Sequence, residues 1–216
     1  SLVGSEMCIR DSISVYNLEK AIVASGYPML TEYDPCKVMD EVSEVKEWIE
    51  TYYSMKGQAP NKHIQRAIRL CQAPSNSGHC NFLSGILVTM DVTASNVWWL
   101  QCGRYHFIQN VSSMSKMHKL KAMRAAKDEY MFHPKVSTVI QNEFFDDDVF
   151  SDVNDDEELS YSCPMGMLLT AHISTNYLQL RTVYEQRKNH KLSEWRMFCN
   201  IISTLSFGPE FIAQGF

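Results

Sequence analysis

Polar and cationic side chains gather in one stretch of this sequence, directly after a segment with the composition of a strand. The stretch contains Gln101, Arg104, His106, Ser112, Ser113, Ser115, His118 and Lys119. On a helix, the three-residue spacing of Gln101 and Arg104 puts both side chains on one face. An amide beside a guanidinium suits an anionic heterocycle, such as a uracil or flavin ring, or a phosphate. The pattern thus indicates a nucleotide-type site, although a pair of water-contacting surface residues has the same spacing.

Other chemistries find less support. No Gly-rich phosphate loop follows a strand, and neither GxSxG nor HExxH occurs, so a serine hydrolase or zinc protease is not indicated. The seven cysteines have no CxxC spacing, which is typical of reduced, cytosolic thiols. Cys71, His79 and Cys80 lack a second ligand pair and would make a poor tetrahedral site, so we expect no metal. Eight acidic residues fall within the thirteen positions 146–158, and their repulsion predicts an exposed loop.

Length and composition indicate one ordinary globular domain. The 216 residues are 45% hydrophobic and 21% charged, and the formal net charge is -5. The negative net charge argues against nucleic-acid binding. Binding of nucleic acid by the basic run from Lys116 to Lys127 is therefore the weakest of the functional alternatives. No apolar run approaches the roughly 18–20 residues of a membrane helix.

Residues 1–12, SLVGSEMCIRDS, resemble a translated sequencing adapter or else form a flexible leader, and we assign the domain to 13–216.

Hydrophobic periodicity and turn residues predict a mixed set of elements. We expect helices at 14–25, 35–55 and 64–71, and a β-branched strand at 86–93. A further helix is expected at 94–108, followed by a basic helix after Ser115. The last element, 174–205, has a buried stripe interrupted near 189–193 and predicts two helices or a kinked one.

The stretch from Gln101 to Ser115 resembles the signature of the flavin-dependent thymidylate synthases. That signature reads Q-x-x-R-H-R and then x-x-S-x-N-E-x-S-x-R. Further matching positions, in family order, are Gly78-His79, the strand 86–92, Pro164, Asn176, Arg187 and Glu194-Trp195. The resemblance covers about residues 77–205, over half of the chain.

The resemblance implies an α+β, thymidylate synthase-complementing (ThyX-like) fold, with a small antiparallel sheet packed with long helices. It also implies a cytoplasmic homotetramer whose sites form between subunits. The reaction that the resemblance implies converts dUMP to dTMP, with FAD as cofactor and NADPH and methylenetetrahydrofolate as co-substrates. In such an enzyme the protein binds, orients and stabilises charge, and the cofactor carries the chemistry.

Individual roles also follow from the resemblance. Arg187 would stabilise charge on the pyrimidine and, with Ser115, form the catalytic pair. Gln101, Ser115, Arg187 and Lys119 would bind the nucleotide, and either His118 or Lys119 would stand in for an arginine of the signature. The cofactor would be held by His79, Arg104, His106 and Asn176.

The signature is altered at several positions. Its arginine-histidine-arginine reads Arg104-Tyr105-His106, and its asparagine-glutamate reads Ser112-Ser113. Met117 stands in place of an arginine, and so does Ser160. These changes leave open a second interpretation, a non-catalytic relative that binds a nucleotide or flavin without turnover.

Overall fold

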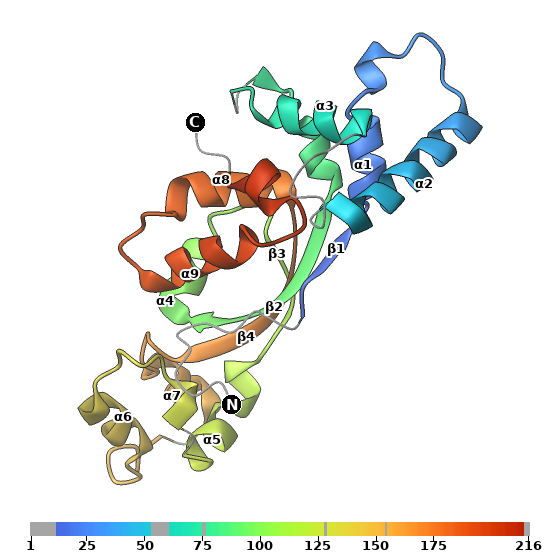
Figure 1. Ribbon diagram of the computed structural model, residues 1–216. Helices are drawn as coiled ribbons and strands as arrows, with labels where there is room; N and C mark the ends of the chain where they lie inside the picture. Colours follow the sequence, from blue (N-terminus) through green and yellow to red (C-terminus); the bar gives the residue numbers. More distant parts are fainter. Residues whose placement is uncertain (1–11, 53–60, 75–76, 128, 154, 214–216) are drawn as a thin grey trace. The chain divides into compact units, whose positions relative to one another are not determined.

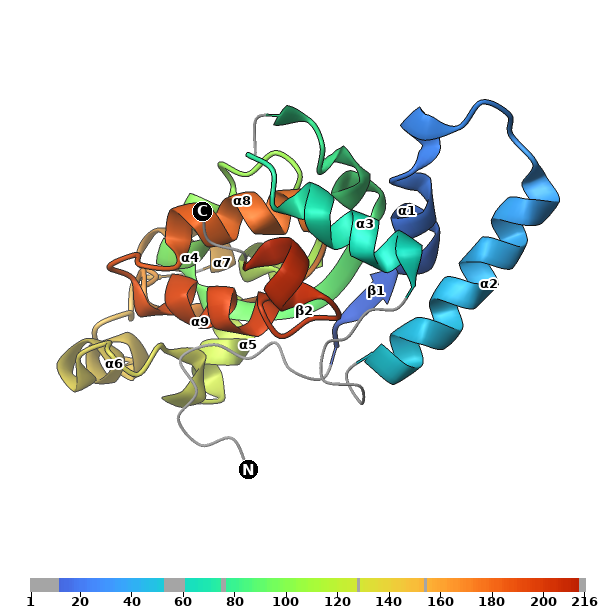
Figure 2. The same cartoon turned by 45° about the horizontal axis from the view of Figure 1, so that its top comes forward.

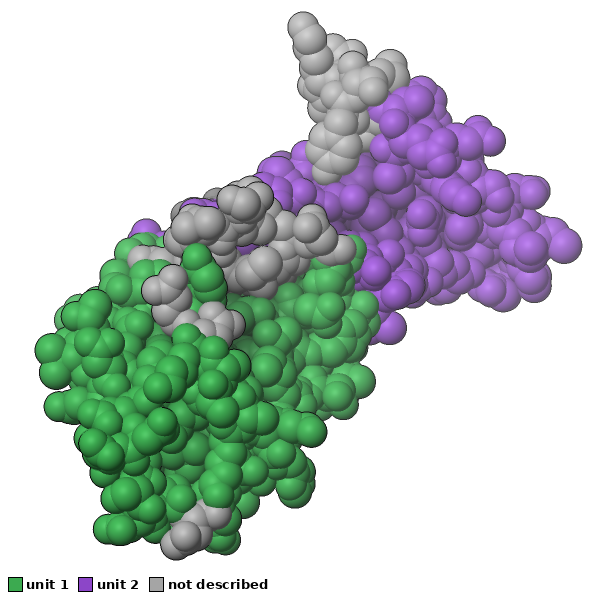
Figure 3. Space-filling view, turned by 90° about the horizontal axis from the view of Figure 1, so that it is seen from below, with its two compact units in different colours: residues 1–13, 89–174, 190–198 green, residues 14–88, 175–189, 199–216 purple. Residues whose placement is uncertain are grey.

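The computed structural model describes residues 12–52, 61–74, 77–127, 129–153 and 155–213 (Figure 1). Within these ranges the chain forms two compact units. Unit 1 contains residues 12–13, 89–174 and 190–198, and unit 2 contains 14–88, 175–189 and 199–213, apart from the undescribed positions (Figure 3). Most of the segment interpreted as a leader lies outside the described residues. Its last residue, Ser12, accepts a 2.8 Å hydrogen bond from the Asp91 N–H.

One four-stranded antiparallel sheet supplies strands to both units. Its strands are β1 (Ser14–Tyr16), β2 (Leu87–Ser95), β3 (Gln109–Ser113) and β4 (Leu168–Asn176), in the order β1-β2-β4-β3. Alternate residues of β2 are buried, namely Val88, Met90, Val92 and Ala94, as a strand with one face on a core requires. The edge strand β3 pairs with β4 and has an irregularity between Asn110 and Ser112.

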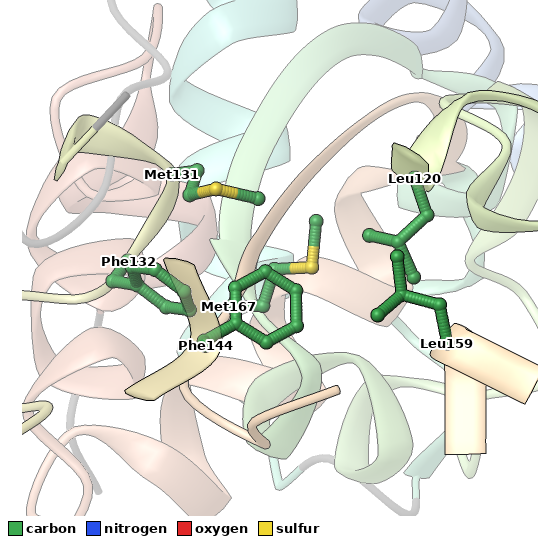
Figure 4. Packing of buried hydrophobic residues seen from close by; sticks show 6 residues of the cluster. All are labelled: Leu120, Met131, Phe132, Phe144, Leu159 and Met167. Atoms are coloured by element: carbon green, nitrogen blue, oxygen red, sulfur yellow. The ribbon is translucent and has the colours of Figure 1, made fainter. Parts of the chain in front are cut away.

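Unit 1 has two groups of buried side chains. Its helical elements are α4 (Asn96–Cys102), α5 (Lys116–Ala125), η4 (Glu129–Met131), α6 (Thr138–Phe145), α7 (Asp156–Tyr161) and the start of α9 (Ser193–Ile202). The first group is aromatic: Trp98 packs on Trp195 and Phe198, with ring centroids 4.7 and 5.4 Å apart. The second joins α5, η4, α6 and α7 to the residue before β4 and consists of Leu120, Met131, Phe132, Phe144, Leu159 and Met167 (Figure 4).

Unit 2 is mainly helical. It comprises β1, α1 (Leu18–Ala24), η1 (Tyr27–Met29), α2 (Pro35–Tyr52), α3 (Lys62–Cys71), η3 (Asn81–Gly85), α8 (Tyr177–Arg187) and the π-helical turn η5 (Gly208–Ile212). Helix α1 packs against α2 and α3, and α8 packs against η3 and η5 (Figure 2). No helix in the described ranges has the length and apolarity needed to cross a bilayer.

Three predicted boundaries are wrong. Residues 14–16 form a strand rather than a first helical turn, because they pair at the edge of the sheet. The helix predicted to reach residue 108 ends at Cys102, where Gly103 closes it with a hydrogen bond to the Trp99 carbonyl. Residues 174–176 belong to β4 rather than to the following helix.

The acidic segment 146–158 is only partly a loop. Helix α7 begins at Asp156, and the Asp155 side chain caps it by accepting from the Glu158 N–H at 2.9 Å. Acidic groups stabilise this end of a helix because the first N–H groups are unsatisfied and positive. Asp147 pairs with Arg124 at 3.0 Å. Repulsion within the segment is therefore offset by a helix terminus and by a basic side chain of α5.

Candidate functional site

The candidate site begins where β2 passes into α4. Ser95 caps α4, since its hydroxyl accepts from the Trp98 N–H at 3.3 Å. Ser95 is itself held by the buried carboxylate of Glu194, which accepts from the Ser95 N–H at 2.7 Å and from its hydroxyl at 2.6 Å. The direction of α4 is thus fixed by a charge-assisted contact between residues 99 positions apart.

Gln101 projects from α4 toward the aromatic core of unit 1. The Trp195 indole N–H donates to Gln101 Oε1 at 2.9 Å, so the carbonyl end of this amide has an internal partner. Trp195 is fully buried and Gln101 half-buried. The contact places Gln101 at the edge of the core rather than on an open helical face.

Arg104, Tyr105 and His106 lie beyond the helix. The Arg104 N–H closes a turn on the Gln101 carbonyl at 3.3 Å, so the prediction that Gln101 and Arg104 share one face of a helix is wrong. Tyr105 is buried against Trp195, with ring centroids 5.7 Å apart. Arg104 and His106 are exposed, and the Arg104 guanidinium has no ion-pair partner among the described residues. The turn therefore buries the tyrosine and presents two nitrogen-rich side chains to solvent.

A cavity of about 260 Å³ lies beside this turn, within unit 1. Its wall is formed by α4 and the turn, by β3 and by β4, through Trp99, Cys102, Gly103, Ile108, Asn110, Ser113, Met114, Leu169, Thr170, Ala171 and Ile173. The Trp99 indole N–H donates to the Leu169 carbonyl at 3.0 Å, which ties α4 to β4 at the wall. Apolar walls with a few polar groups are typical of sites for small organic ligands.

Ser115 and Lys119 lie at the start of α5 and within it, after β3. Ser115 is the exposed residue before α5, with extended backbone (φ −96°, ψ 118°), and its hydroxyl does not cap the helix. Lys119 is exposed on α5 itself. Next to Ser115, Lys116 donates to Asn96 Oδ1 at 3.3 Å. Within unit 1, five predicted residues thus follow one another along α4, the turn and α5: Gln101, Arg104, His106, Ser115 and Lys119.

The other three predicted residues belong to unit 2. Asn176 caps α8, since its Oδ1 accepts from the Gln179 N–H at 2.9 Å. Arg187 is the last residue of α8 and is half-buried. His79 is exposed and follows Gly78, whose φ of 75° lies in the region that favours glycine.

Buried thiols near these elements are not nucleophiles at neutral pH. Burial raises the pKa of Cys102, at the end of α4, to about 12. Burial also raises the pKa of Cys199 to about 12, against the opposing charge of Arg187 and Lys188. Both thiols are therefore protonated, and a thiolate is the reactive form of cysteine.

Sequence reasoning missed the wall of the cavity formed by β3 and β4. Asn110, Leu169 and Thr170 line it, but none stood out as a motif. Thr170 bonds Thr93 across β2 and β4 at 2.8 Å, so its position depends on strand pairing. The one available signal was the alternation of Ala171, Ile173 and Thr175, which are buried on one face of β4.

No family model and no curated protein matches this sequence. Among solved structures, the chain is similar to two of the flavin-dependent thymidylate synthase ThyX from Helicobacter pylori, each with FAD and dUMP. One is 14% identical with a TM-score of 0.57, and the match covers 96% of this chain and 98% of that one. The other is 12% identical with a TM-score of 0.57, over 95% and 96%. The predicted fold class is confirmed: this chain has the mixed, small-sheet fold of ThyX.

Proposed function

We propose that this chain is a divergent flavin-dependent thymidylate synthase, which methylates dUMP reductively to dTMP. The observation that carries the proposal is the position of the signature-like segment. Within the ThyX fold, Cys102, Gly103, Ser113 and Met114 of this segment line the cavity of unit 1. The nearby Arg104 offers a charged fork to a phosphate or a ring carbonyl.

The cavity fits one flat heterocycle rather than a whole dinucleotide. Its volume of about 260 Å³ lies just below the roughly 300–1,000 Å³ of ordinary ligand pockets. Trp99, Ile108 and Leu169 supply apolar walls, while Asn110 and Ser113 supply polar groups for a ring edge. The remainder of FAD or dUMP would then extend outside this cavity, which agrees with the proposal that sites are completed between subunits of a homotetramer.

The residues of this chain would bind and orient the reactants. When bound, FAD supplies the redox chemistry, with NADPH as reductant and methylenetetrahydrofolate as the carbon donor. The exposed Arg104 and His106 would contact the cofactor, and Ser115 and Lys119 would contact the nucleotide. Arg187 would stabilise negative charge on the pyrimidine, an electrostatic role of a few kcal/mol in a site without water. Gln101, whose Oε1 accepts from Trp195, would hydrogen-bond the nucleotide.

A second candidate function is nucleotide or flavin binding without turnover. Two signature positions favour it, because both are directed into the protein. The Gln101 carbonyl is bonded to Trp195, and Tyr105, in place of the family's histidine, is buried against the same ring. A signature that packs internally has fewer groups left for reactants.

Flavin absorbance and tritium release separate the two candidates. Both predict yellow purified protein with the absorbance band of oxidised flavin. Only the enzyme releases tritium from 5-labelled dUMP when NADPH and methylenetetrahydrofolate are present. Flavin-loaded protein with no release above a flavin-only control would contradict turnover and support the binding protein. Colourless protein that does not take up added FAD would contradict both.

Substitution of Arg187 tests the nucleotide site. We expect Arg187→Ala to weaken dUMP binding about 10- to 100-fold, the usual range for loss of a charge-assisted contact. Lys188→Ala, which removes the neighbouring charge, should bind dUMP as the parent protein does. Calorimetric titration measures both, and thermal unfolding checks that each variant is folded. Equal affinity of Arg187→Ala and the parent protein would remove Arg187 from the site.

A further inference from the structure

A second cavity of about 310 Å³ lies in unit 1, where α9 begins. It shares no lining residue with the cavity described above. Its walls come from the end of β2, from the loop between η4 and α6 and from the residues that lead into α9. Nothing in the proposed thymidylate synthase activity uses this cavity, so its chemistry has to be derived from its own side chains.

Cationic and donor groups dominate its lining. Lys135 and Lys191 are both exposed and both line the cavity. The Lys135 ammonium donates to Ser193 Oγ at 2.9 Å, so the Ser193 hydroxyl hydrogen is directed to another acceptor. Ser193 is also the first residue of α9, a ten-residue helix. The unsatisfied N–H groups and positive dipole end of such a helix add to the attraction for an anion.

The carboxylate in the lining does not cancel this charge locally. Glu194 is 1% exposed, and each of its oxygens accepts a hydrogen bond from Ser95, at 2.7 and 2.6 Å. A carboxylate bonded in this way is oriented toward the end of β2. Two lysines, Lys135 and Lys191, line the cavity beside this one carboxylate.

A buried histidine in the wall lacks an acceptor. His133 is 6% exposed, and its Nδ1 accepts from the Lys135 N–H at 3.1 Å. In the neutral ring the proton is then on Nε2, which makes Nε2–H a donor. Within the described part of the chain this nitrogen has no hydrogen-bond partner. A buried donor beside two lysines and a helix N-terminus is an arrangement that an anionic acceptor would complete.

We propose that this cavity binds a phosphate-class oxyanion, free or as a phosphate monoester. Lys135, Lys191, Ser193 and the first N–H groups of α9 contact the anion, and His133 forms the adjoining wall. Phosphate suits the site because it offers several acceptor oxygens to donors that converge from different elements. The site is separate from the proposed dUMP and FAD site and adds an anion-binding function to unit 1.

Calorimetric titration with two probes tests the proposal. Inorganic phosphate and glycerol 3-phosphate are titrated separately into the full chain and into Lys191→Met, Lys135→Met and Lys46→Met. Lys46 is an exposed lysine of α2 in unit 2 and provides the matched loss of one charge. We expect saturable binding to the parent protein and to Lys46→Met, and at least tenfold weaker binding to the two cavity variants. The tighter of the two probes identifies the form of phosphate.

A spectroscopic measurement keeps the test independent of how the variants fold. Phosphate should shift the His133 ring ¹⁵N resonances of the parent protein, and the shift should saturate at the calorimetric midpoint. Two results would overturn the proposal. One is the absence of saturable binding of either probe to the parent protein. The other is equal weakening in Lys46→Met and in the cavity variants, which would indicate a general effect of charge.

Discussion

Two pairs of an arginine and a nearby histidine in this molecule have opposite surroundings. In unit 2, His63 and Arg66 lie on α3; in unit 1, Arg104 and His106 lie in the turn after α4. The first pair is buried or half-buried and bonded to neighbouring elements, and the second pair is exposed. Similar residue types therefore have different roles, and burial with internal partners distinguishes a structural pair from a pair available to a ligand.

The pair in unit 2 joins helices. The Arg66 guanidinium donates to the Ile22 and Val23 carbonyls at 3.4 and 3.1 Å and to Ser25 Oγ at 3.2 Å. Helix α1 ends at Ala24, and its last-turn carbonyls already accept from the Gly26 N–H and the Ser25 hydroxyl, so Arg66 adds a second donor to each. The backbone leaves room for it at Gly26, where an added Cβ would lie 2.5 Å from Arg66 Cζ.

Loss of the structural arginine should have the largest effect on stability. We expect Arg66→Ala to lower the free energy of unfolding by about 2–4 kcal/mol, because several charge-assisted hydrogen bonds to buried residues are lost together. Arg104→Ala should change it by no more than about 0.5 kcal/mol, the usual range for an exposed position. Urea unfolding followed by circular dichroism measures both.

A third variant controls for the position in α3. Arg69 is exposed on the same helix, and Arg69→Ala should leave the free energy of unfolding close to that of the parent protein. If Arg66→Ala were no more destabilising than Arg69→Ala, the hydrogen bonds to α1 would contribute nothing measurable, and the contrast between the two arginines would fail.

Elements with strong local periodicity were predictable from the sequence. Helix α2 begins at Pro35 as expected, α3 matches the expected helix within two residues, and β2 begins one residue later and ends two residues later than its predicted strand. The break between α8 and α9 falls at 188–192, where the buried stripe was interrupted. In each case the core-facing residues lie close together in sequence, so their spacing alone carries the information.

Elements stabilised by distant partners were not predictable. Every residue of β3 is exposed, so it has no apolar alternation, and it exists through its pairing with β4. The environment of Gln101 depends on Trp195, 94 residues away. The resemblance to a signature identified which residues to examine, but it could not show that Tyr105 is buried. Whether these residues form a working site stays a prediction.

Loss of the exposed Arg104 should weaken ligand binding rather than lower stability. Under the proposed function, we expect Arg104→Ala to weaken FAD binding about tenfold or more, or about 1.4 kcal/mol, because the guanidinium fork is available to the ligand. Arg104→Lys keeps the charge but loses the fork, so its affinity should be intermediate. Fluorescence titration of FAD measures all three proteins. Identical affinities would mean that exposure of Arg104 reflects ordinary surface and not a site.

The smallest expected effect is a pH dependence that originates at His63. Burial lowers its pKa below the ordinary 6.5, against the attraction of Glu41, and the charge of Arg66 lowers it further. His63 Nδ1 lies 3.1 Å from Arg66 Nη2 and accepts from it, so protonation would remove that hydrogen bond. A pKa depressed on folding means that the unfolded chain binds the proton first.

Stability from this group is therefore fully present above about pH 6.5 and is lost as the pH falls from there through the folded-state pKa. Urea unfolding of the parent protein between pH 7.5 and 5 should show this loss, and His63→Gln should show a smaller one, because glutamine does not titrate. The difference between the two curves isolates the contribution of His63 from that of the carboxylates. Parallel curves would mean that His63 is no harder to protonate in the folded chain, and that its burial beside Arg66 does not distinguish it energetically from an exposed histidine.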